Sequence, residues 1–291
     1  MLKGLYDHYG KAQKILVTGS ARLDYYRHSG DSLQGRYHYL RLLPLSVAEL
    51  QDASAQTFDQ LLRLGGFPEP FEVGEETFAK RWSREYRSRL IREEISSLES
   101  ISDLGKLEHL MLRLPDLVGS PLSINAPRED LQVSFKLAAK WIEILERFYA
   151  IFRVPPFGSP KVKAVKKEQK HFHMDWTLVE EMGARFENLV AVHLLKWVFE
   201  QQDCWGEDLD LRYFRDEEGR EVDFVIVKKR APILFVECKW GQREFSPHLK
   251  YLSRKFPGVR AVQVHAQKSL EFMNDEGLEM LSAQTFLAEL V

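Results

Sequence analysis

The sequence has only two cysteines, Cys204 and Cys238, and no run of apolar residues long enough to cross a membrane. A spanning helix needs roughly 20 such residues, so we expect no transmembrane segment. Two thiols without the spacing of a zinc site predict neither a disulfide framework nor a structural zinc. No signal-peptide pattern opens the sequence, and together these absences predict a cytoplasmic protein.

The chain also lacks an excess of charge of either sign. Its formal net charge is −2, with 41 basic and 43 acidic side chains. Any contact with nucleic acid must therefore come from local basic patches. Hydrophobic residues make up 44% of the 291 residues, which is ordinary for a globular protein, and this length predicts two or three domains.

Three charged side chains interrupt two apolar runs near the C-terminus. The runs are Glu221 to Val227 and Ile233 to Trp240, and the charged residues within them are Asp223, Glu237 and Lys239. Both runs have the length and composition of strands and are separated by a short turn-like segment, so we predict an antiparallel β-hairpin.

The predicted register brings the two carboxylates together. A turn from Lys228 to Pro232 lets Val227 face Ile233, and the same register lets Asp223 face Glu237. Side chains alternate between the two faces of a sheet, so all four of these residues share one face. Directly opposed Cβ atoms lie roughly 4.5 to 5.5 Å apart, where two negative charges repel each other unless a cation or proton lies between them.

A divalent metal ion would resolve this repulsion. Carboxylate oxygens suit Mg²⁺, which commonly takes one or two carboxylates and fills its other positions with water and phosphate oxygens. We therefore predict Asp223 and Glu237 as metal ligands, with Lys239 orienting a water molecule or offsetting phosphate charge. The alternative is an ion pair between Glu237 and Lys239 at the rim of a sheet, with Asp223 only beginning a strand.

Asp223 followed by Glu237-Cys-Lys239 resembles the signature of the PD-(D/E)xK nuclease-like superfamily. A preceding helix is predicted from Gly183 to Phe199, because its apolar residues recur at helical spacing. In that superfamily an acidic residue of the preceding helix often joins the metal site, so the resemblance adds Glu187. It implies four catalytic residues, namely Asp223, Glu237, Lys239 and Glu187.

The N-terminal part predicts one unit of a larger parallel sheet. An amphipathic segment precedes Lys14 to Ser20, a short apolar run that we predict as a buried strand. Next come Ser32-Leu-Gln-Gly-Arg36 and Leu42-Leu-Pro-Leu-Ser-Val-Ala-Glu49. This combination resembles the late part of an AAA-type P-loop ATPase core. The resemblance implies that Ser20 faces the γ-phosphate of ATP and that Arg36 acts as a phosphate-directed or finger-type arginine.

The nucleotide-binding front of such an ATPase is missing from the sequence. It contains no G-x-x-x-x-G-K-[ST] motif, and no strand ending in paired acidic residues precedes Leu2. We therefore expect ATP binding only in a full-length relative. We expect the chain to be a truncated form of a longer ATPase. The alternatives are a fragment, or a remnant that has kept only the distal elements of the ATPase core. The alternative for Arg36 is an ion pair with Asp31.

The middle of the chain predicts helices followed by a DNA-binding module. Residues 56–105 read as a helical segment whose arginine-rich helix, Glu76 to Leu98, has a solvated salt-bridged face. Residues 106–169 have the spacing of a winged helix-turn-helix. Outward-facing lysines of its second helix and of its wing indicate DNA contacts. These lysines are Lys136 and Lys140 on the helix, and Lys161, Lys163, Lys166, Lys167 and Lys170 on the wing. The alternative is a winged helix that serves as a domain spacer or a protein-binding platform, with its lysines only solvated.

The whole order resembles the archaeal and bacterial ATPases that carry a C-terminal DUF4143 region. The predicted fold is multi-domain α/β, with an ATPase-core remnant at 1–55, the helical segment, the winged helix-turn-helix and a nuclease-like domain at 170–291. Two functions stay open. One is a DNA-associated, Mg²⁺-dependent phosphodiesterase, and the other is a non-catalytic module that binds DNA or a protein and regulates an ATPase. The run from Lys170 to Asp175 predicts a strand that enters the last domain. His171 and His173 alternate onto one face of that strand and predict a structural pair, because a third metal ligand is lacking.

Overall fold

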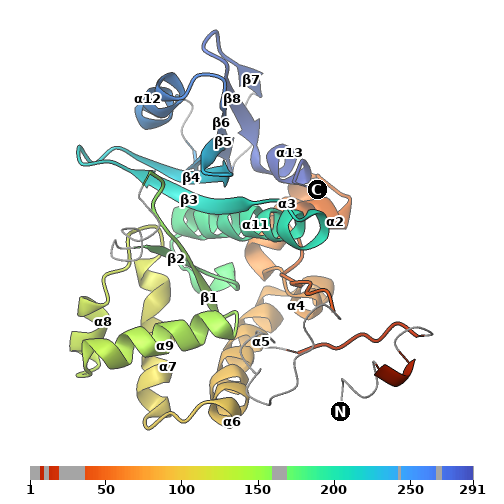
Figure 1. Ribbon diagram of the computed structural model, residues 1–291, viewed down its shortest axis with the longest axis vertical. Helices are drawn as coiled ribbons and strands as arrows, with labels where there is room; N and C mark the ends of the chain where they lie inside the picture. Colours follow the sequence, from red (N-terminus) through yellow and green to blue (C-terminus); the bar gives the residue numbers. More distant parts are fainter. Residues whose placement is uncertain are drawn as a thin grey trace.

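The protein is described by a computed structural model that covers most of the chain. The described residues are 7–9, 13–19, 37–158, 169–241, 244–266 and 271–290. The model has a mixed α/β fold with a mixed sheet, which confirms the predicted α/β class at that level (Figure 1). Among the described residues, no helix is both long and apolar enough to span a membrane.

The part of the chain before the first strand is helical. Its elements are α2 (Val47–Leu50), α3 (Ala55–Leu64), α4 (Pro68–Val73), α5 (Glu76–Arg89), the π-helical η2 (Leu90–Ile95), α6 (Ser96–Leu98), α7 (Leu104–Arg113), the 3-10 helix η3 (Leu114–Leu117), α8 (Asn125–Asp130) and α9 (Phe135–Arg147). The helix predicted from Glu76 to Leu98 is the continuous run α5–η2–α6. Local capping explains several starts: the Ser134 side chain, for example, accepts the Leu137 N–H at the start of α9.

The C-terminal part contains the sheets and the longest helix. Its elements are β1 (Ile151–Val154), β2 (Lys170–His173), the 3-10 helix η4 (Trp176–Leu178), α11 (Met182–Trp205), β3 (Leu209–Arg215), β4 (Glu221–Lys228), β5 (Ala231–Lys239), α12 (Pro247–Lys255), β6 (Arg260–His265), β7 (Phe272–Met273), β8 (Leu278–Ser282) and α13 (Ala283–Ala288).

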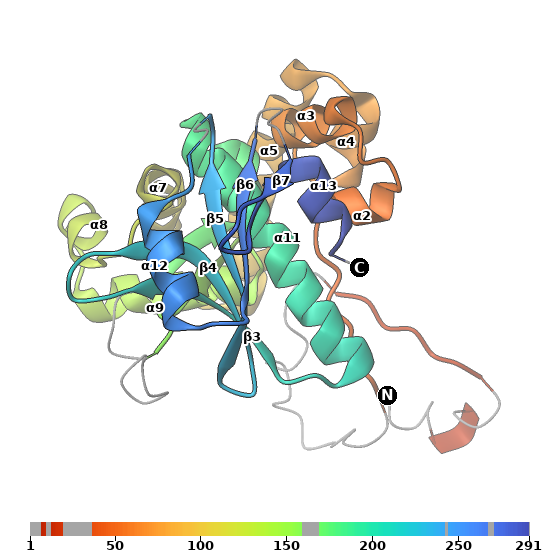
Figure 2. The same ribbon diagram turned by 90° about the horizontal axis from the view of Figure 1, so that it is seen from above.

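The main sheet has the strand order β3-β4-β5-β6-β8-β7. Strands β3, β4 and β5 form an antiparallel meander, β5, β6 and β8 are parallel, and β7 pairs antiparallel with β8. Helices α11 and α12 lie on opposite sides of this sheet (Figures 1 and 2). One core joins α11, α13 and the first helices to one face, and a second core joins α12 to the other face.

Strands β1 and β2 form a separate two-stranded sheet with a double role. Ile151 belongs to the core of the helical part, whereas Phe152, Val154 and Phe172 belong to the core on the α11 face. Period-two alternation explains this division, because successive side chains of a strand point to opposite faces. The small sheet is therefore a layer shared by the helices and the C-terminal part.

The predicted hairpin is present as β4 and β5, but its turn differs from the prediction. The reversal occurs at Lys229 and Arg230, whose φ angles are 48° and 72°, rather than across Lys228 to Pro232. Val227 pairs with Pro232 and not with Ile233, because a bulge shifts the register after Ile226. A tight turn of two residues with left-handed backbone conformation matches the twist of the two strands better than a longer loop does.

The predicted strand from Lys14 to Ser20 is absent among the described residues 13–19. Leu16 is 88% exposed there, so this apolar run has no sheet to enter. A parallel strand needs neighbours to satisfy its backbone groups and bury its side chains, and hydrophobic sequence alone does not supply them. Ser20 and Arg36 lie outside the described residues.

Candidate metal centre

A buried lysine lies at the centre of an acidic cluster between β2, α11 and β4. Lys170 is completely buried, and its Nζ lies 2.6 Å from Glu221 Oε1, 3.0 Å from Glu187 Oε1 and 3.6 Å from Asp223 Oδ1. The sequence placed Lys170 on a basic wing, which was wrong because it opens strand β2 and faces inward. Lysine is almost never fully buried unless it is paired, and three carboxylates supply that pairing here.

Helix α11 brings Glu187 to this cluster. The helix begins after Glu181, whose carboxylate accepts the backbone N–H groups of Gly183 and Ala184. Gly119, at φ 87°, lies against Glu187, and a Cβ atom there would come within 3.2 Å of Glu187 Oε2. The glycine therefore permits both a left-handed backbone and the close approach of the carboxylate.

A bulge in β4 aims Asp223 at the cluster. Arg212 pairs with Val225 but Phe214 pairs with Val222, so two steps along β3 correspond to three along β4. The extra residue places Val222 and Val225 in the same core, although regular alternation would separate them. Bulges re-aim side chains in this way. Asp223 therefore does not share a face of the sheet with Val225, and its carboxylate contacts Lys170. Regular alternation along β4 would have placed both residues on the same face.

Asp223 also links the lysine cluster to the second half of the site. Its Oδ2 accepts the N–H of Cys238 at 2.8 Å, next to Glu237 on β5. Glu237 is only 3% exposed, and its Oε1 lies 2.7 Å from Lys239 Nζ. Its Oε2 is buried and has no partner in hydrogen-bond geometry among the described residues, although the Ser246 side chain is close enough to Glu237 to lower its pKa slightly. An orphaned buried carboxylate oxygen is costly, so its presence needs an explanation.

The ionisable groups of the site influence one another. Burial, with a smaller contribution from Asp223, raises the pKa of Glu237 to about 7, against the opposing effect of Lys239. Burial also raises the pKa of Glu187 to about 8, although Lys170 opposes this. For Lys170, burial alone would lower the pKa, but the nearby carboxylates of Glu187, Asp223 and Glu221 outweigh it and raise it. Perturbed groups of this kind gather at functional sites.

The donor set suits a hard cation. Across the described ranges, no three His, Cys, Asp or Glu side chains form a ready set of metal ligands. Asp223 and Glu237 nevertheless offer carboxylate oxygens, of which Glu237 Oε2 is unengaged. Mg²⁺ is commonly held by one or two carboxylates with water and phosphate oxygens, so two carboxylates fit this ion.

Of the four residues predicted from sequence, Glu187 and Asp223 both contact Lys170, and Glu237 pairs with Lys239. The Cys238 N–H, which Asp223 accepts, links the two groups. Sequence reasoning missed Lys170 as a partner and Glu221 as a member. The sequence contains one indication that Lys170 is buried. Lys170 is the first residue of the predicted strand that contains His171 and His173, and alternation puts its side chain on the face opposite to the two histidines.

The other predicted positions fall elsewhere. Lys136 and Lys140 are exposed on α9, away from its buried stripe. The four wing positions Lys161, Lys163, Lys166 and Lys167 lie outside the described residues. His171 and His173 are fully buried on one face of β2 with ring centroids 5.7 Å apart, and His171 Nε2 lies 2.8 Å from the Leu114 carbonyl oxygen.

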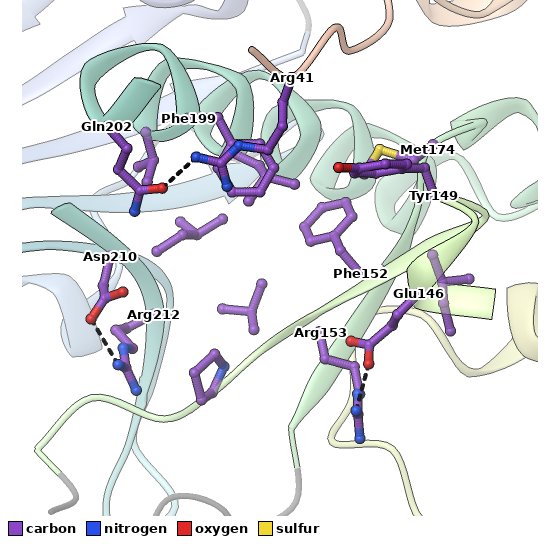
Figure 3. Close-up of a pocket in the computed structure, with 16 residues that line it drawn as sticks. Arg41, Glu146, Tyr149, Phe152, Arg153, Met174, Phe199, Gln202, Asp210 and Arg212 are labelled. Atoms are coloured by element: carbon purple, nitrogen blue, oxygen red, sulfur yellow. Dashed lines mark hydrogen bonds and ion pairs between the residues drawn. The ribbon is translucent and has the colours of Figure 1, made fainter. Parts of the chain in front are cut away.

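A separate cavity of about 360 Å³ lies between β1, β3 and the second half of α11 (Figure 3). Its wall combines apolar side chains with three arginines, and each arginine has a partner. Arg41 contacts Asp203 and Gln202 and lies 3.4 Å over the Phe199 ring. Arg153 contacts Glu146, and Arg212 contacts Asp210. The cavity therefore offers no unpaired cation among these three residues.

Three family models match successive parts of the chain. An AAA domain model matches residues 1–51, a domain of unknown function (DUF8612) matches 55–188, and a domain of unknown function (DUF4143) matches 182–286. Residues 1–51 are thus similar to an AAA domain and residues 182–286 to a DUF4143 region, in the order that the sequence motifs predicted. The DUF8612 match covers the helical part from α3 onwards, together with both strands of the small sheet.

One curated relative and one solved structure are also similar. The relative is an uncharacterized protein, MJ1544, of Methanocaldococcus jannaschii, which is 21% identical over 92% of this chain. The chain spans 64% of the length of that relative. The structure is a half-complex from a tetradecameric assembly of Thermococcus gammatolerans McrB AAA+ hexamers with bound McrC. It matches 99% of this chain and 64% of its own, at 11% identity and a TM-score of 0.27, which is too low to support a shared fold.

Proposed function

We propose that the C-terminal part of this ATPase-related chain binds a divalent cation, preferably Mg²⁺, and cleaves phosphodiester bonds in DNA. The observation that carries the proposal is the buried Oε2 of Glu237, which has no hydrogen-bond partner among the described residues and belongs to a carboxyl whose pKa the Asp223 charge helps to raise. A cation held by both carboxylates would supply the missing partner and offset their repulsion.

The residues present have distinct tasks in this proposal. Asp223 and Glu237 hold the cation, and the Cys238 N–H fixes the Asp223 carboxylate. Lys239, whose side chain is 26% exposed beside Glu237, offsets the charge of an incoming phosphate or orients the attacking water. When bound, the metal ion would act as a Lewis acid on a phosphate oxygen.

The preceding module supports contact with DNA. Helices α7, α8 and α9 are followed by β1 and β2, and Pro121 forms an isolated bridge with Lys170. This is the order of elements expected of a winged helix, and it supports the proposal. In such modules the last helix enters the major groove and the wing contacts the backbone. We propose that Lys136 and Lys140 of α9 contact DNA phosphates, together with Lys161, Lys163, Lys166 and Lys167, which the sequence predicts on a wing.

We propose ATP binding only for longer relatives of this chain. The AAA match to residues 1–51 supports an origin in an ATPase, but the phosphate-binding motif is absent from this sequence. We propose that Ser20 and Arg36 sense nucleotide only where an ATPase front, or another ATPase subunit, completes the site.

The test is cleavage of supercoiled DNA by the whole chain in Mg²⁺ or Mn²⁺. We expect nicking that EDTA abolishes and that Asp223→Asn and Glu237→Gln each lower by at least about 100-fold. Asp210→Asn is a matched control, because this carboxylate is on the adjacent strand β3 and pairs only with Arg212 outside the site. Cleavage that survives in both site variants would contradict the proposal.

A second candidate is a non-catalytic module that binds DNA or a protein partner and regulates an ATPase. It is favoured by Lys170, which already neutralises part of the acidic cluster without a metal. Salt-dependent DNA binding without cleavage, weakened when Lys136 and Lys140 are changed to Gln, would support this second candidate over the first.

A further inference from the structure

Lys170 provides the acidic cluster with a cation that belongs to the chain itself. Its ammonium group contacts carboxylates of both α11 and β4, and it is completely buried. Two of its partners, Glu187 and Asp223, are residues that the sequence assigned to one metal site. The ammonium ion therefore stands where a metal ion bridging those two residues would have to lie.

We propose that Lys170 is a tethered cation that occupies one cation position, so that the centre accepts a single divalent ion at Asp223 and Glu237. Glu187 and Glu221 then hold the lysine and are not metal ligands. This inference rests on the proposed metal-binding function and defines its stoichiometry.

The formal charges support a single ion. The site contains four carboxylates, those of Glu187, Glu221, Asp223 and Glu237, and two ammonium groups, those of Lys170 and Lys239. When all four carboxylates are ionised, two negative charges are in excess, which one divalent ion neutralises. A second divalent ion would leave the largely buried site with a net positive charge, which burial disfavours.

The backbone of Lys170 is fixed, so its ammonium group cannot easily leave. The residue pairs with Val154 in the small sheet and also forms the bridge with Pro121. The Tyr213 ring lies 5.7 Å from Nζ, and Gly119 allows Glu187 to approach from α11. Lys239 differs, because its side chain is 26% exposed at the end of β5 and is available to substrate.

The experiment measures Mn²⁺ binding to the whole chain without DNA, by electron paramagnetic resonance and calorimetry. We expect the unmodified protein to bind one Mn²⁺. Asp223→Asn should weaken binding at least about 10-fold, whereas Glu187→Gln should change it less than about 3-fold. Each of these two substitutions replaces a carboxylate with an amide of nearly the same size and shape, so we expect both variants to fold.

A second set of variants tests the lysine directly. Lys170→Met should bind a second Mn²⁺ at the freed carboxylates, and its melting temperature should rise with Mn²⁺ by several degrees more than that of the unmodified protein. Lys228→Met is the control, because Lys228 at the end of β4 pairs with Glu207 outside the site. If Lys170→Met does not fold, the comparison of Glu187→Gln with Asp223→Asn decides.

Two results would overturn the inference: two Mn²⁺ ions in the unmodified protein, or a loss of Mn²⁺ in Glu187→Gln as large as in Asp223→Asn. A chain that binds one Mn²⁺ but cleaves no DNA would contradict the proposed nuclease and support the tethered cation. If the unmodified protein binds no Mn²⁺, the proposed metal centre fails. In that event, Mn²⁺ binding gained by Lys170→Met would uphold the role of the lysine, and none gained would refute it.

Discussion

Lys170 Nζ lies 2.6 Å from Glu221 Oε1, and this ion pair joins the small sheet to the main sheet. We expect Glu221→Gln to lower the free energy of unfolding by about 1 to 3 kcal/mol, because it removes the charge nearest to a buried ammonium group. Urea unfolding measures the change. Glu218→Gln is the control, since Glu218 pairs with Arg220 at an exposed turn. Equal stability of the two variants would show that the pair contributes nothing.

Deprotonation of Glu237 should lower the free energy of unfolding of the protein as the pH rises towards 8. Burial raises its pKa from 4.5 to about 7, so the folded chain holds a proton that the unfolded chain releases between these values. Stability from this proton is full below about pH 4.5 and is lost as the pH rises through about 7. We therefore expect Glu237→Gln, without added metal, to be more stable than the unmodified protein at pH 8, by about 1 to 3 kcal/mol.

The comparison at pH 4.5 supplies the internal control for that prediction. There the carboxyl of Glu237 is protonated in the folded state, so the difference from Glu237→Gln should nearly vanish. Glu276→Gln, at an exposed pair with Arg254, should show no comparable dependence on pH. A gain in stability that is the same at both pH values would mean that titration of Glu237 is not its cause.

His171 and His173 should destabilise the fold in acid. Burial lowers the pKa of His171 to about 4 and lowers that of His173 well below its ordinary value. Since the unfolded chain then binds protons that the folded chain does not, stability falls as the pH drops from about 6.5 to about 4. His173→Leu should flatten this fall in thermal unfolding, because neither His173 ring nitrogen has a partner among the described residues. His109→Gln, at an exposed position on α7, should leave the slope unchanged.

Gly66 should not tolerate a side chain. A Cβ atom there would come within 2.5 Å of the Trp176 ring and 2.7 Å of Pro44 Cβ. Gly66 also accepts the Leu45 N–H through its carbonyl oxygen, so the backbone cannot move aside freely. We expect Gly66→Ala to cost at least about 2 kcal/mol in denaturant unfolding. Gly105→Ala, inside helix α7 with ordinary contacts, should be neutral or stabilising.

The hairpin and α11 followed from local patterns, because apolar spacing depends only on neighbouring residues. The environment of Lys170 did not, since its partners come from α11 and β4, and a run of lysines before it suggested an exposed wing. The aim of Asp223 depends on a bulge that appears only when β3 is paired with β4. Regular alternation cannot predict an extra residue in one strand. The strand predicted at Lys14 is absent for another reason: its sequence suits a strand, but none of the described strands pairs with it.

The small sheet β1–β2 contributes side chains to the cores on both of its sides. A change that destabilises this small sheet removes packing contacts from both cores, so the parts of the protein on its two sides should unfold together. We therefore expect the helices from α7 to α9 and the sheet against α11 to form one cooperative unit in native-state hydrogen exchange, with the amides of Phe152 and Phe172 among the last to exchange.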